Sequence, residues 1–272
     1  MHDLHFHTSL SACAPQESSL KTMLAALKKA GVTTAGVANH LWDPGVPGAS
    51  PWYAPQNVKH VLAIKEEYAA LSPEERQGIK LYFGCETEYV GQGRVALKSE
   101  NAELFDYVLV PAHHFHMKYT VRPAELEKAD AVGKLMLDRF IECCNIDFAF
   151  GIAHPFMVLG YAGREDEILE TLSDDDFYRA FSHAASKNKS VELNIHILDQ
   201  KTKRDAENLP FEYRRMFTIA VQCKCKFHLG SDAHDTQRLE KTRFEHALKF
   251  AEKCGIEFTE DPLVKKSNCL RN

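Results

Sequence analysis

The regular alternation of short apolar segments with longer helical ones is the feature that most constrains the fold of this chain. Seven segments have the character of strands, and a helix or loop follows each. Parallel strands need crossover connections, and those crossovers share one hand. The alternation therefore predicts an α/β fold of one domain over residues 1–272, with the strands arranged as a parallel barrel. The strands are expected at the start of the chain and at residues 32–38, 79–83, 105–110, 148–153, 190–193 and 226–229.

Helices are expected between these strands. Ser18 and Ser19 can cap the first helix at its N-terminus, and Gly31 stops it. The segment 41–56 is rich in Pro, Gly and aromatic residues and predicts a long loop instead. The expected helices span residues 18–30, 57–71, 123–144, 174–187, 211–223 and 236–253.

Composition and charge exclude some classes of function. With 44% hydrophobic and 26% charged residues, the 272-residue chain has the composition of a globular protein with a full core. A net charge of -5 gives no basic surface for duplex nucleic acid, so a negatively charged substrate must be held locally. The sequence contains neither an apolar run of membrane-spanning length nor a secretory leader. We therefore expect no membrane partner and a cytoplasmic location.

Histidine and carboxylate side chains recur in phase with the predicted strand ends. His5 and His7 are one residue apart, a spacing that directs both imidazoles to the same face of a strand. An isolated pair of this kind is as often a solvent-facing strand edge as a metal site. The recurrence favours a metal site, because the C-terminal ends of barrel strands converge. The residues in phase are His5, His7, His40, Glu86, His113, His154, Glu192, Asn194, Asp232 and His234.

So many converging ligands exceed what one ion needs. Zinc usually takes four ligands, and paired metals are commonly bridged by a carboxylate. An imidazole-rich set suits Zn, Mn or Fe better than Mg or Ca, which prefer oxygen ligands. The sequence therefore predicts a site for two to three divalent transition metal ions. Hydrolysis by a metal-activated hydroxide is the chemistry that such a site performs best.

Six short motifs resemble, in order and spacing, those of the PHP (polymerase and histidinol phosphatase) superfamily. The resemblance extends from Asp3 to His234 and implies a distorted (β/α)7 barrel of the TIM-like type, a trinuclear metal site and phosphoesterase activity. The single-domain length is similar to the histidinol-phosphatase-like branch. The motifs are His5-Phe6-His7-Thr8, Asn39-His40, Gly84-Cys85-Glu86, Ala112-His113, Ala153-His154-Pro155 and Gly230-Ser231-Asp232-Ala233-His234.

The resemblance also implies how the ligands are shared. The first metal would be held by His5, His7, Glu86 and Asp232. Glu86 would bridge to a second metal, held also by His113 and His154. Asp232 or His234 would manage the proton in hydrolysis.

The third metal of the family is usually held by a pair corresponding to His40 and His234, with one more His or Asp shortly after the His-x-His motif. Here Ala12 and Cys13 occupy the positions where that ligand would fall. Either Cys13 supplies a thiolate, which favours zinc, or the third site is weakened. A weakened site is the preferred interpretation, because a substituted thiol is more often a space filler.

Other polar residues near the strand ends are candidates for supporting roles. Glu88, Glu192 and Asn194 are expected to orient ligands through hydrogen bonds, although a surface position is equally open for Glu88. His116 is expected to reach the substrate, whereas His114 is expected to point away and pack. Basic residues after the fourth and fifth strands grip phosphate in histidinol-phosphatase-like proteins, which implies a similar role for Lys118, Arg122 and Arg164.

These observations predict a hydrolase acting on phosphoric ester bonds of a small phosphorylated metabolite. Histidinol phosphate, a substrate of histidine biosynthesis, is the first candidate. A nucleotide or oligonucleotide phosphoesterase, such as a nucleoside bisphosphate phosphatase, is the alternative, because relatives with the same metals act on such esters. The aromatic loop 41–56, with Trp42, Trp52 and Tyr53, either stacks on an imidazole or nucleobase or covers the barrel rim. A metal-binding protein without turnover remains a further alternative.

Overall fold

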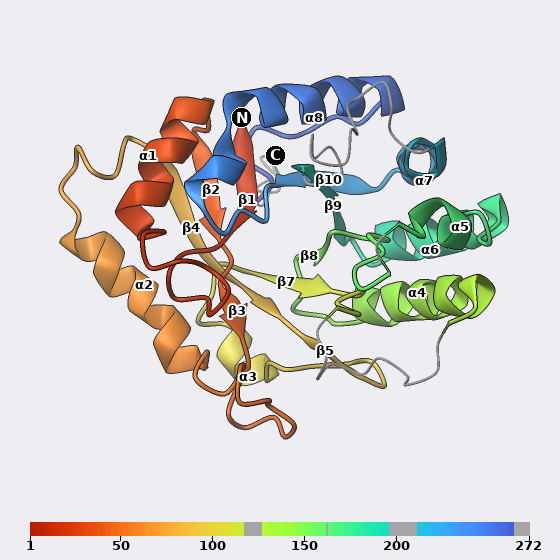
Figure 1. The fold of residues 1–272 in the computed structure, drawn as a ribbon, viewed down its shortest axis with the longest axis horizontal. Coiled ribbons are helices and arrows are strands. Elements are labelled where there is room, and N and C mark those ends of the chain that lie inside the picture. The colour runs from red at the N-terminus through yellow and green to blue at the C-terminus, as the bar shows by residue number, and fades with distance from the viewer. Residues whose placement is uncertain (117–126, 162, 196–210, 264–272) are drawn as a thin grey trace, which may run out of the picture.

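Seven parallel strands form the centre of the molecule, and helices surround them (Figure 1). The computed structural model describes residues 1–116, 127–161, 163–195 and 211–263. The strand order β1-β2-β4-β7-β8-β9-β10 follows the chain, and each neighbouring pair is parallel. The predicted barrel is therefore confirmed. Its strands are β1 (His2–Phe6), β2 (Thr34–Val37), β4 (Lys80–Thr87), β7 (Tyr107–Pro111), β8 (Gly151–Ala153), β9 (Ser190–Asn194) and β10 (Lys226–Gly230).

The first and last strands meet and nearly close the barrel. The His7 amide donates a hydrogen bond of 2.8 Å to the carbonyl of Ala233, and Phe6 and Ala233 form a parallel bridge. A short strand, β3 (His40–Leu41), continues beyond β2 and pairs with β4, which sets His40 opposite Glu86. The C-terminal ends of β1, β3, β4 and β10 thus meet at one end of the barrel.

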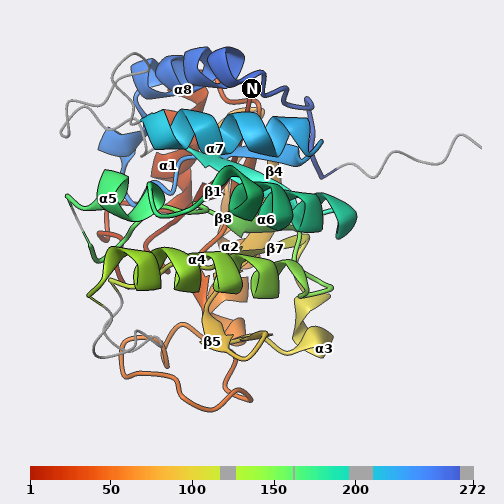
Figure 2. The ribbon, with the colours of Figure 1, turned by 90° about the vertical axis from the view of Figure 1, so that its right-hand side faces the viewer.

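The helices pack around the outside of the barrel. Figure 2 shows α4, α6, α7 and α8 stacked side by side on one outer face. Among the described residues, no helix is both long enough and apolar enough to cross a lipid bilayer. The helices are α1 (Leu20–Ala30), α2 (Val58–Ala70), α3 (Ser99–Ala102), α4 (Ala129–Cys144), α5 (Glu165–Leu169), α6 (Asp174–Ser186), α7 (Phe211–Gln222) and α8 (Lys241–Cys254).

Local capping explains several helix boundaries. The Ser19 side chain accepts a hydrogen bond from the Thr22 amide at the start of α1, and Gly31 ends that helix with φ of 91°. The predicted last helix is wrong in one respect: it is broken at Glu240 into a 3₁₀ helix, Thr236–Leu239, and α8. A hairpin of β5 (Tyr89–Gly91) and β6 (Arg94–Val95) was not predicted, and neither were α3 and α5.

One large side chain fills the interior of the barrel below the strand ends. Tyr107 on β7 points inward, and its hydroxyl donates a hydrogen bond of 2.7 Å to the Leu4 carbonyl on β1. Gly36 and Gly84 lie against its ring, so close that a Cβ atom at either position would clash with it. These two glycines are therefore required by packing and not by backbone conformation.

We expect Gly84→Ala to destabilise the protein by about 1–3 kcal/mol, because the added methyl group must displace the Tyr107 ring in a packed interior. Urea denaturation measures this cost. In a Tyr107→Leu background the same glycine substitution should cost much less, since the ring is gone. An equal cost in both backgrounds would contradict the packing argument.

Candidate metal centre

The buried carboxylate of Glu86, near the end of β4, lies at the middle of a cluster of imidazoles. Its Oε2 lies 2.9 Å from His40 Nδ1 and 3.6 Å from His5 Nε2. Its Oε1 lies 3.0 Å from His154 Nε2 and 3.5 Å from His114 Nε2. Burial opposes ionisation of Glu86, but the positive charges of the surrounding histidines hold its pKa well below the usual value. Glu86 therefore sits where a bridging carboxylate was predicted.

His5, His7 and Asp232 form a first group beside Glu86. The Nε2 atoms of His5 and His7 are 3.2 Å apart, and Asp232 Oδ1 lies 3.6 Å and 3.2 Å from them, respectively. Both imidazoles are fully buried, whereas the Asp232 side chain is 20% exposed. These ligand atoms lie close enough together to hold one metal ion.

Glu86, His114 and His154 form a second group. The Nε2 atoms of His114 and His154 are 3.0 Å apart. The sequence predicted His113 as the ligand and His114 as a packing residue, whereas the structure brings His114, and not His113, into this group. His113 Nε2 donates to the Met136 carbonyl, and His113 Nδ1 accepts from the Phe156 amide, so both ring nitrogens are already occupied.

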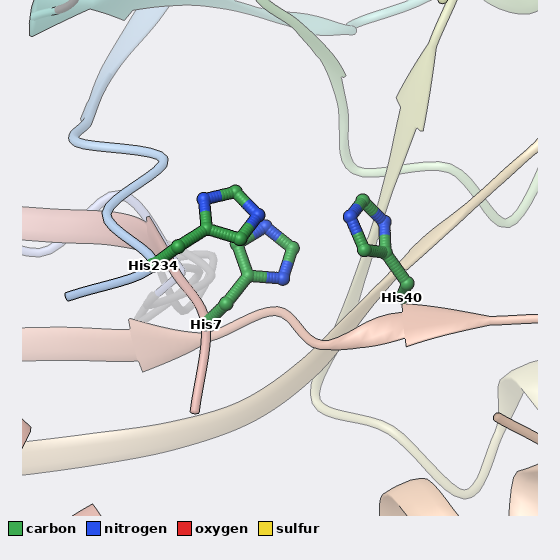
Figure 3. A group of neighbouring side chains, drawn as sticks. All are labelled: His7, His40 and His234. Carbon is green, nitrogen blue, oxygen red and sulfur yellow. The ribbon is translucent and has the colours of Figure 1, made fainter. Parts of the chain in front are cut away.

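His7, His40 and His234 form a third group nearer to solvent (Figure 3). The rings of His7 and His234 stack with centroids 4.2 Å apart, and His40 approaches His7 from β3 at 4.4 Å. Cys13, an exposed residue, lies beside His40 and His234. Burial of its thiol raises the pKa, but hydrogen bonding to the two imidazoles outweighs this and lowers the pKa of Cys13 to about 6. Ala12 offers no ligand side chain; its amide donates to Gln56.

Two carboxylates hold imidazoles of the centre from behind. Glu192 Oε2 accepts a hydrogen bond of 2.7 Å from His5 Nδ1, and Glu88 Oε1 accepts one of 2.5 Å from His114 Nδ1. With Nδ1 protonated in each case, the lone pair on Nε2 faces the centre. Glu88 and Glu192, the residues expected to orient ligands, are thus each hydrogen-bonded to an imidazole of the centre.

Glu192 also connects the first and second groups. Its Oε1 accepts hydrogen bonds from the Asn194 side chain at 2.7 Å and from the His154 amide at 3.2 Å. On its other side, His228 Nε2 lies 3.4 Å from Oε2. A Cβ atom at Gly230 would approach the Glu192 carboxylate to 2.7 Å, so glycine leaves the space that the carboxylate fills.

A neutral network holds His7, and the sequence analysis did not identify it. The Ser11 hydroxyl donates to Asn39 Oδ1 at 3.0 Å and lies 3.0 Å from His7 Nδ1, from which it accepts. It also accepts from the His40 amide at 3.1 Å. His7 Nε2 is thereby directed at the centre. The spacing of Ser11 four residues after His7 was the available signal.

The backbone is strained at two of the strand ends. His154 and Asp232 have φ values of 29° and 49°, in the left-handed region that residues other than glycine seldom adopt. Such strain is maintained only where the surroundings fix the conformation, and it is concentrated at functional sites. Both residues belong to the ligand groups described above.

The donor set fits divalent metal ions. Glu86 Oε2 and His40 Nδ1 are both buried and lie 2.9 Å apart, and among the described residues neither atom has a hydrogen-bond partner in ordinary geometry. Two pairs of imidazole Nε2 atoms also converge within 3.2 Å. Buried polar atoms normally have hydrogen-bond partners, and atoms that instead aim at a shared point are arranged like metal ligands.

The predicted phosphate-binding residues are placed only in part. The His116 ring packs edge-on against His114 at 5.1 Å, beside the second group. Burial and the charges of His114 and His154 lower the pKa of His116 to about 4. Arg164 pairs with Glu167 at 2.7 Å at the start of α5. Lys118 and Arg122 lie outside the described residues.

Fold and site together define a βα barrel whose strand ends assemble a histidine- and carboxylate-rich centre of the kind that holds divalent metals. No family model matches the chain. The chain is 27% identical over 259 residues to a probable phosphatase of Syntrophotalea carbinolica, a match that covers 93% of this chain and 88% of that protein.

Two solved structures share the fold. Histidinol phosphate phosphatase from Lactococcus lactis subsp. lactis, complexed with zinc, L-histidinol and phosphate, superposes with a TM-score of 0.60 at 17% identity, over 96% of this chain and 97% of that one. A protein described as a histidinol phosphatase from Listeria monocytogenes gives a TM-score of 0.57 at 13% identity, over 88% and 97%. These structures have the barrel fold that the sequence predicted, and the relative from Syntrophotalea carbinolica is a probable phosphatase.

Substituting His113 and His114 with glutamine, one at a time, tests which of the two is a metal ligand. We expect His114→Gln to weaken metal binding at the second group by at least the roughly 10- to 100-fold that loss of an outer partner causes. His113→Gln should keep the metal but lower stability by about 1–3 kcal/mol, because it disturbs two buried backbone partners. Metal analysis after dialysis and thermal unfolding separate the two effects. Loss of metal from the His113 variant with His114 unaffected would restore the original assignment.

Proposed function

We propose that this protein is a metal-dependent phosphoesterase that hydrolyses a small phosphomonoester, with histidinol phosphate as the first candidate substrate. The observation that carries the proposal is the convergence of Glu86 and Asp232 with six imidazoles at one end of the barrel. The phosphatase relative and the shared fold of histidinol phosphate phosphatase, which binds zinc, L-histidinol and phosphate, support it.

Two to three divalent ions are proposed for the centre. His5, His7, Glu86 and Asp232 would hold the first, and Glu86 would bridge to the second with His114 and His154. Zinc is favoured over manganese and iron by the imidazole-rich set and by the zinc of the related structure. When bound, such ions lower the pKa of water and neutralise charge on phosphoryl oxygens.

The proposed proton-transfer residues lie on the solvent side of the centre. The side chains of Asp232 and His234 are 20% and 16% exposed, whereas those of His5, His7 and Glu86 are fully buried. Asp232 Oδ1 lies 3.8 Å from His234 Nδ1. A substrate entering from solvent meets this pair first, so Asp232 is placed to accept a proton from water, and His234 could give one to the leaving oxygen only when it is not held as a ligand of the third group.

The supporting residues keep the ligands in position. Glu192 with Asn194 orients His5, and Glu88 orients His114. His116 is proposed to contact the substrate because it adjoins His114 at the edge of the second group. Lys118 and Arg122 remain predictions for phosphate binding, and Arg164 would have to leave Glu167 to take part.

Cys13 is proposed to complete the third group with His40 and His234. Its thiol lies beside both imidazoles, and a thiolate ligand selects zinc over harder ions. This position favours ligation over the weakened site that the sequence suggested.

One observation supports a second candidate function, that of a nucleotide phosphatase. Trp52 and Tyr53 lie edge-on to His40 with ring centroids 5.5 Å and 6.2 Å away, so the loop that carries them reaches the centre. Aromatic rings at this place can stack on a nucleobase as well as on the imidazole of histidinol.

The activity is tested with the purified protein supplied with Zn, Mn or Fe. We expect release of phosphate from p-nitrophenyl phosphate, loss of activity on chelation, and recovery when metal is restored. Asp232→Asn should lose at least about 100-fold in kcat/KM, whereas Asp235→Asn, whose carboxylate caps the 3₁₀ helix and pairs with Arg238, should stay active. No release with any metal would contradict the proposal and favour a metal-binding protein without turnover. Faster turnover of nucleoside bisphosphates than of histidinol phosphate would reverse the order of substrates.

The role of Cys13 is tested by cobalt substitution. We expect the Co(II) protein to show a thiolate-to-cobalt charge-transfer band in the near ultraviolet that Cys13→Ser abolishes and Cys223→Ser retains, because Cys223 lies directly after α7, beside the Tyr178 carbonyl. Zinc should likewise protect Cys13 from alkylation. A spectrum that is unchanged by Cys13→Ser would show that the thiol is not a ligand.

A further inference from the structure

A buried histidine lies behind the first group, in the interior of the barrel. His228, on β10, is fully buried. It lies two residues before Gly230 and faces the same side of the strand, one layer farther from the strand ends. Its Nδ1 lies 2.8 Å from the Ser190 hydroxyl on β9, and its Nε2 lies 3.4 Å from Glu192 Oε2. The ring therefore connects the Ser190 hydroxyl with the carboxylate that holds His5.

The barrel interior leaves room for this imidazole and fixes its position. A Cβ atom at Gly151 on β8 would lie 2.9 Å from His228 Cε1 and 2.7 Å from the Ser190 carbonyl, so glycine is required by packing there. The Phe150 ring packs at an angle against the His228 ring, with centroids 5.3 Å apart. The imidazole is thus held between neighbouring strands in one orientation.

The carboxylate of Glu192 needs several donors, because it is fully buried. An ionised carboxylate has about four acceptor sites. Oε1 accepts from the Asn194 side chain and the His154 amide, and Oε2 accepts from His5 Nδ1. His228 Nε2 faces the same Oε2 and supplies a fourth donor. Burial raises the pKa of Glu192, but the charge of His5 and the hydrogen bonds from His228 and His5 hold it well below the usual value.

The negative charge of Glu192 determines which ring nitrogen of His228 carries the proton. A lone pair on Nε2 would face the carboxylate and be repelled, so Nε2 carries the proton and Nδ1 accepts from the Ser190 hydroxyl. Burial lowers the pKa of His228, and this outweighs the opposing effect of Glu192, so the ring is neutral at pH 7. The hydrogen bonds therefore run in one direction, from Ser190 through His228 to Glu192.

We propose that His228 is a positioning residue for the first metal ion: its Nε2–H group holds the Glu192 carboxylate, which holds His5 with its Nε2 lone pair toward the centre. This inference rests on the proposed function and extends it into the barrel interior. A carboxylate that is fixed from behind keeps Nδ1 of His5 protonated and strengthens its Nε2 as a ligand. Side chains below the strand ends then contribute to metal affinity.

The test compares the zinc affinity of two variants with that of the wild type, by competition with a chromogenic chelator. His228→Leu removes both ring nitrogens and should weaken zinc binding by about tenfold, the lower end of the range for loss of an outer partner. His228→Gln retains an N–H donor near the position of Nε2 and should bind zinc nearly as well as the wild type. His183→Leu is the matched control, because His183 on α6 pairs with the Asn145 side chain outside the barrel.

A double-substitution cycle shows whether His228 acts through the carboxylate. In a Glu192→Gln background, His228→Leu should have little further effect on zinc affinity, since the charged group that His228 holds is gone. A loss of zinc affinity of the same size in both backgrounds would contradict the inference. A His228→Gln variant that binds zinc as weakly as His228→Leu would contradict it as well, because the donor would then not be the property that matters.

Nitrogen-15 chemical shifts of the imidazole rings in the metal-free protein give a measurement that depends on neither zinc nor activity. We expect the proton of the neutral His228 ring on Nε2 and that of His5 on Nδ1. A proton on Nδ1 of His228 would overturn the inference. Thermal unfolding identifies a purely structural role: a His228→Leu protein that melts lower but binds zinc as tightly as the wild type would overturn the inference too.

The outcomes also separate this inference from the proposed function. Wild-type protein that binds zinc and cleaves esters, with His228→Leu binding zinc equally well, would overturn the role of His228 alone. Wild-type protein that neither binds zinc nor cleaves any ester would overturn both.

Discussion

The structure of the candidate centre depends on burying the carboxylate of Glu86 among imidazoles. An unpaired carboxylate in a barrel interior would cost several kcal/mol, and it is tolerated here because five histidines lie within 3.7 Å of its two oxygens. Those histidines must in turn be held with one nitrogen inward. Glu192, Glu88 and the Ser11 hydroxyl hold His5, His114 and His7 in this way, each through Nδ1. These outer hydrogen bonds determine which ring nitrogen of each histidine carries the proton.

The barrel and most of the centre could be predicted from the sequence because both follow from periodicity. Strand ends in a parallel barrel converge, so His5, Glu86, His154 and Asp232 could be brought together without knowing any distance. The prediction from side-chain alternation did not hold after the end of β7. This strand ends at Pro111, and the turn that follows, closed by the Phe115 amide on the His113 carbonyl at 2.7 Å, no longer alternates side chains. His114 therefore points inward where a continuing strand would have placed His113.

Other features could not be predicted because they depend on contacts between distant segments. Tyr53 reaches the centre because the loop folds back through hydrogen bonds to residue 12, which no local pattern encodes. The break before α8 has a local cause that was overlooked: Asp235 caps the preceding 3₁₀ helix by accepting from the amides of Gln237 and Arg238, and Glu240 is then extended. Short carboxylate side chains at such positions compete with a continuous helix.

The centre also differs in character from its deep end to its solvent end. The deep imidazoles of His5 and His114 are held by carboxylates, which make them stronger ligands and fix them firmly. At the solvent end, His234 is held by the carbonyl of Asp232 and stacks on His7, without a carboxylate behind its ring, and Cys13 belongs to an exposed loop. On the proposed metal assignment, we therefore expect the buried end to contribute most to metal affinity. Cys13, beside His40 at this open end, is therefore the one proposed ligand that is neither an imidazole nor a carboxylate, and the place where the choice of metal would be made.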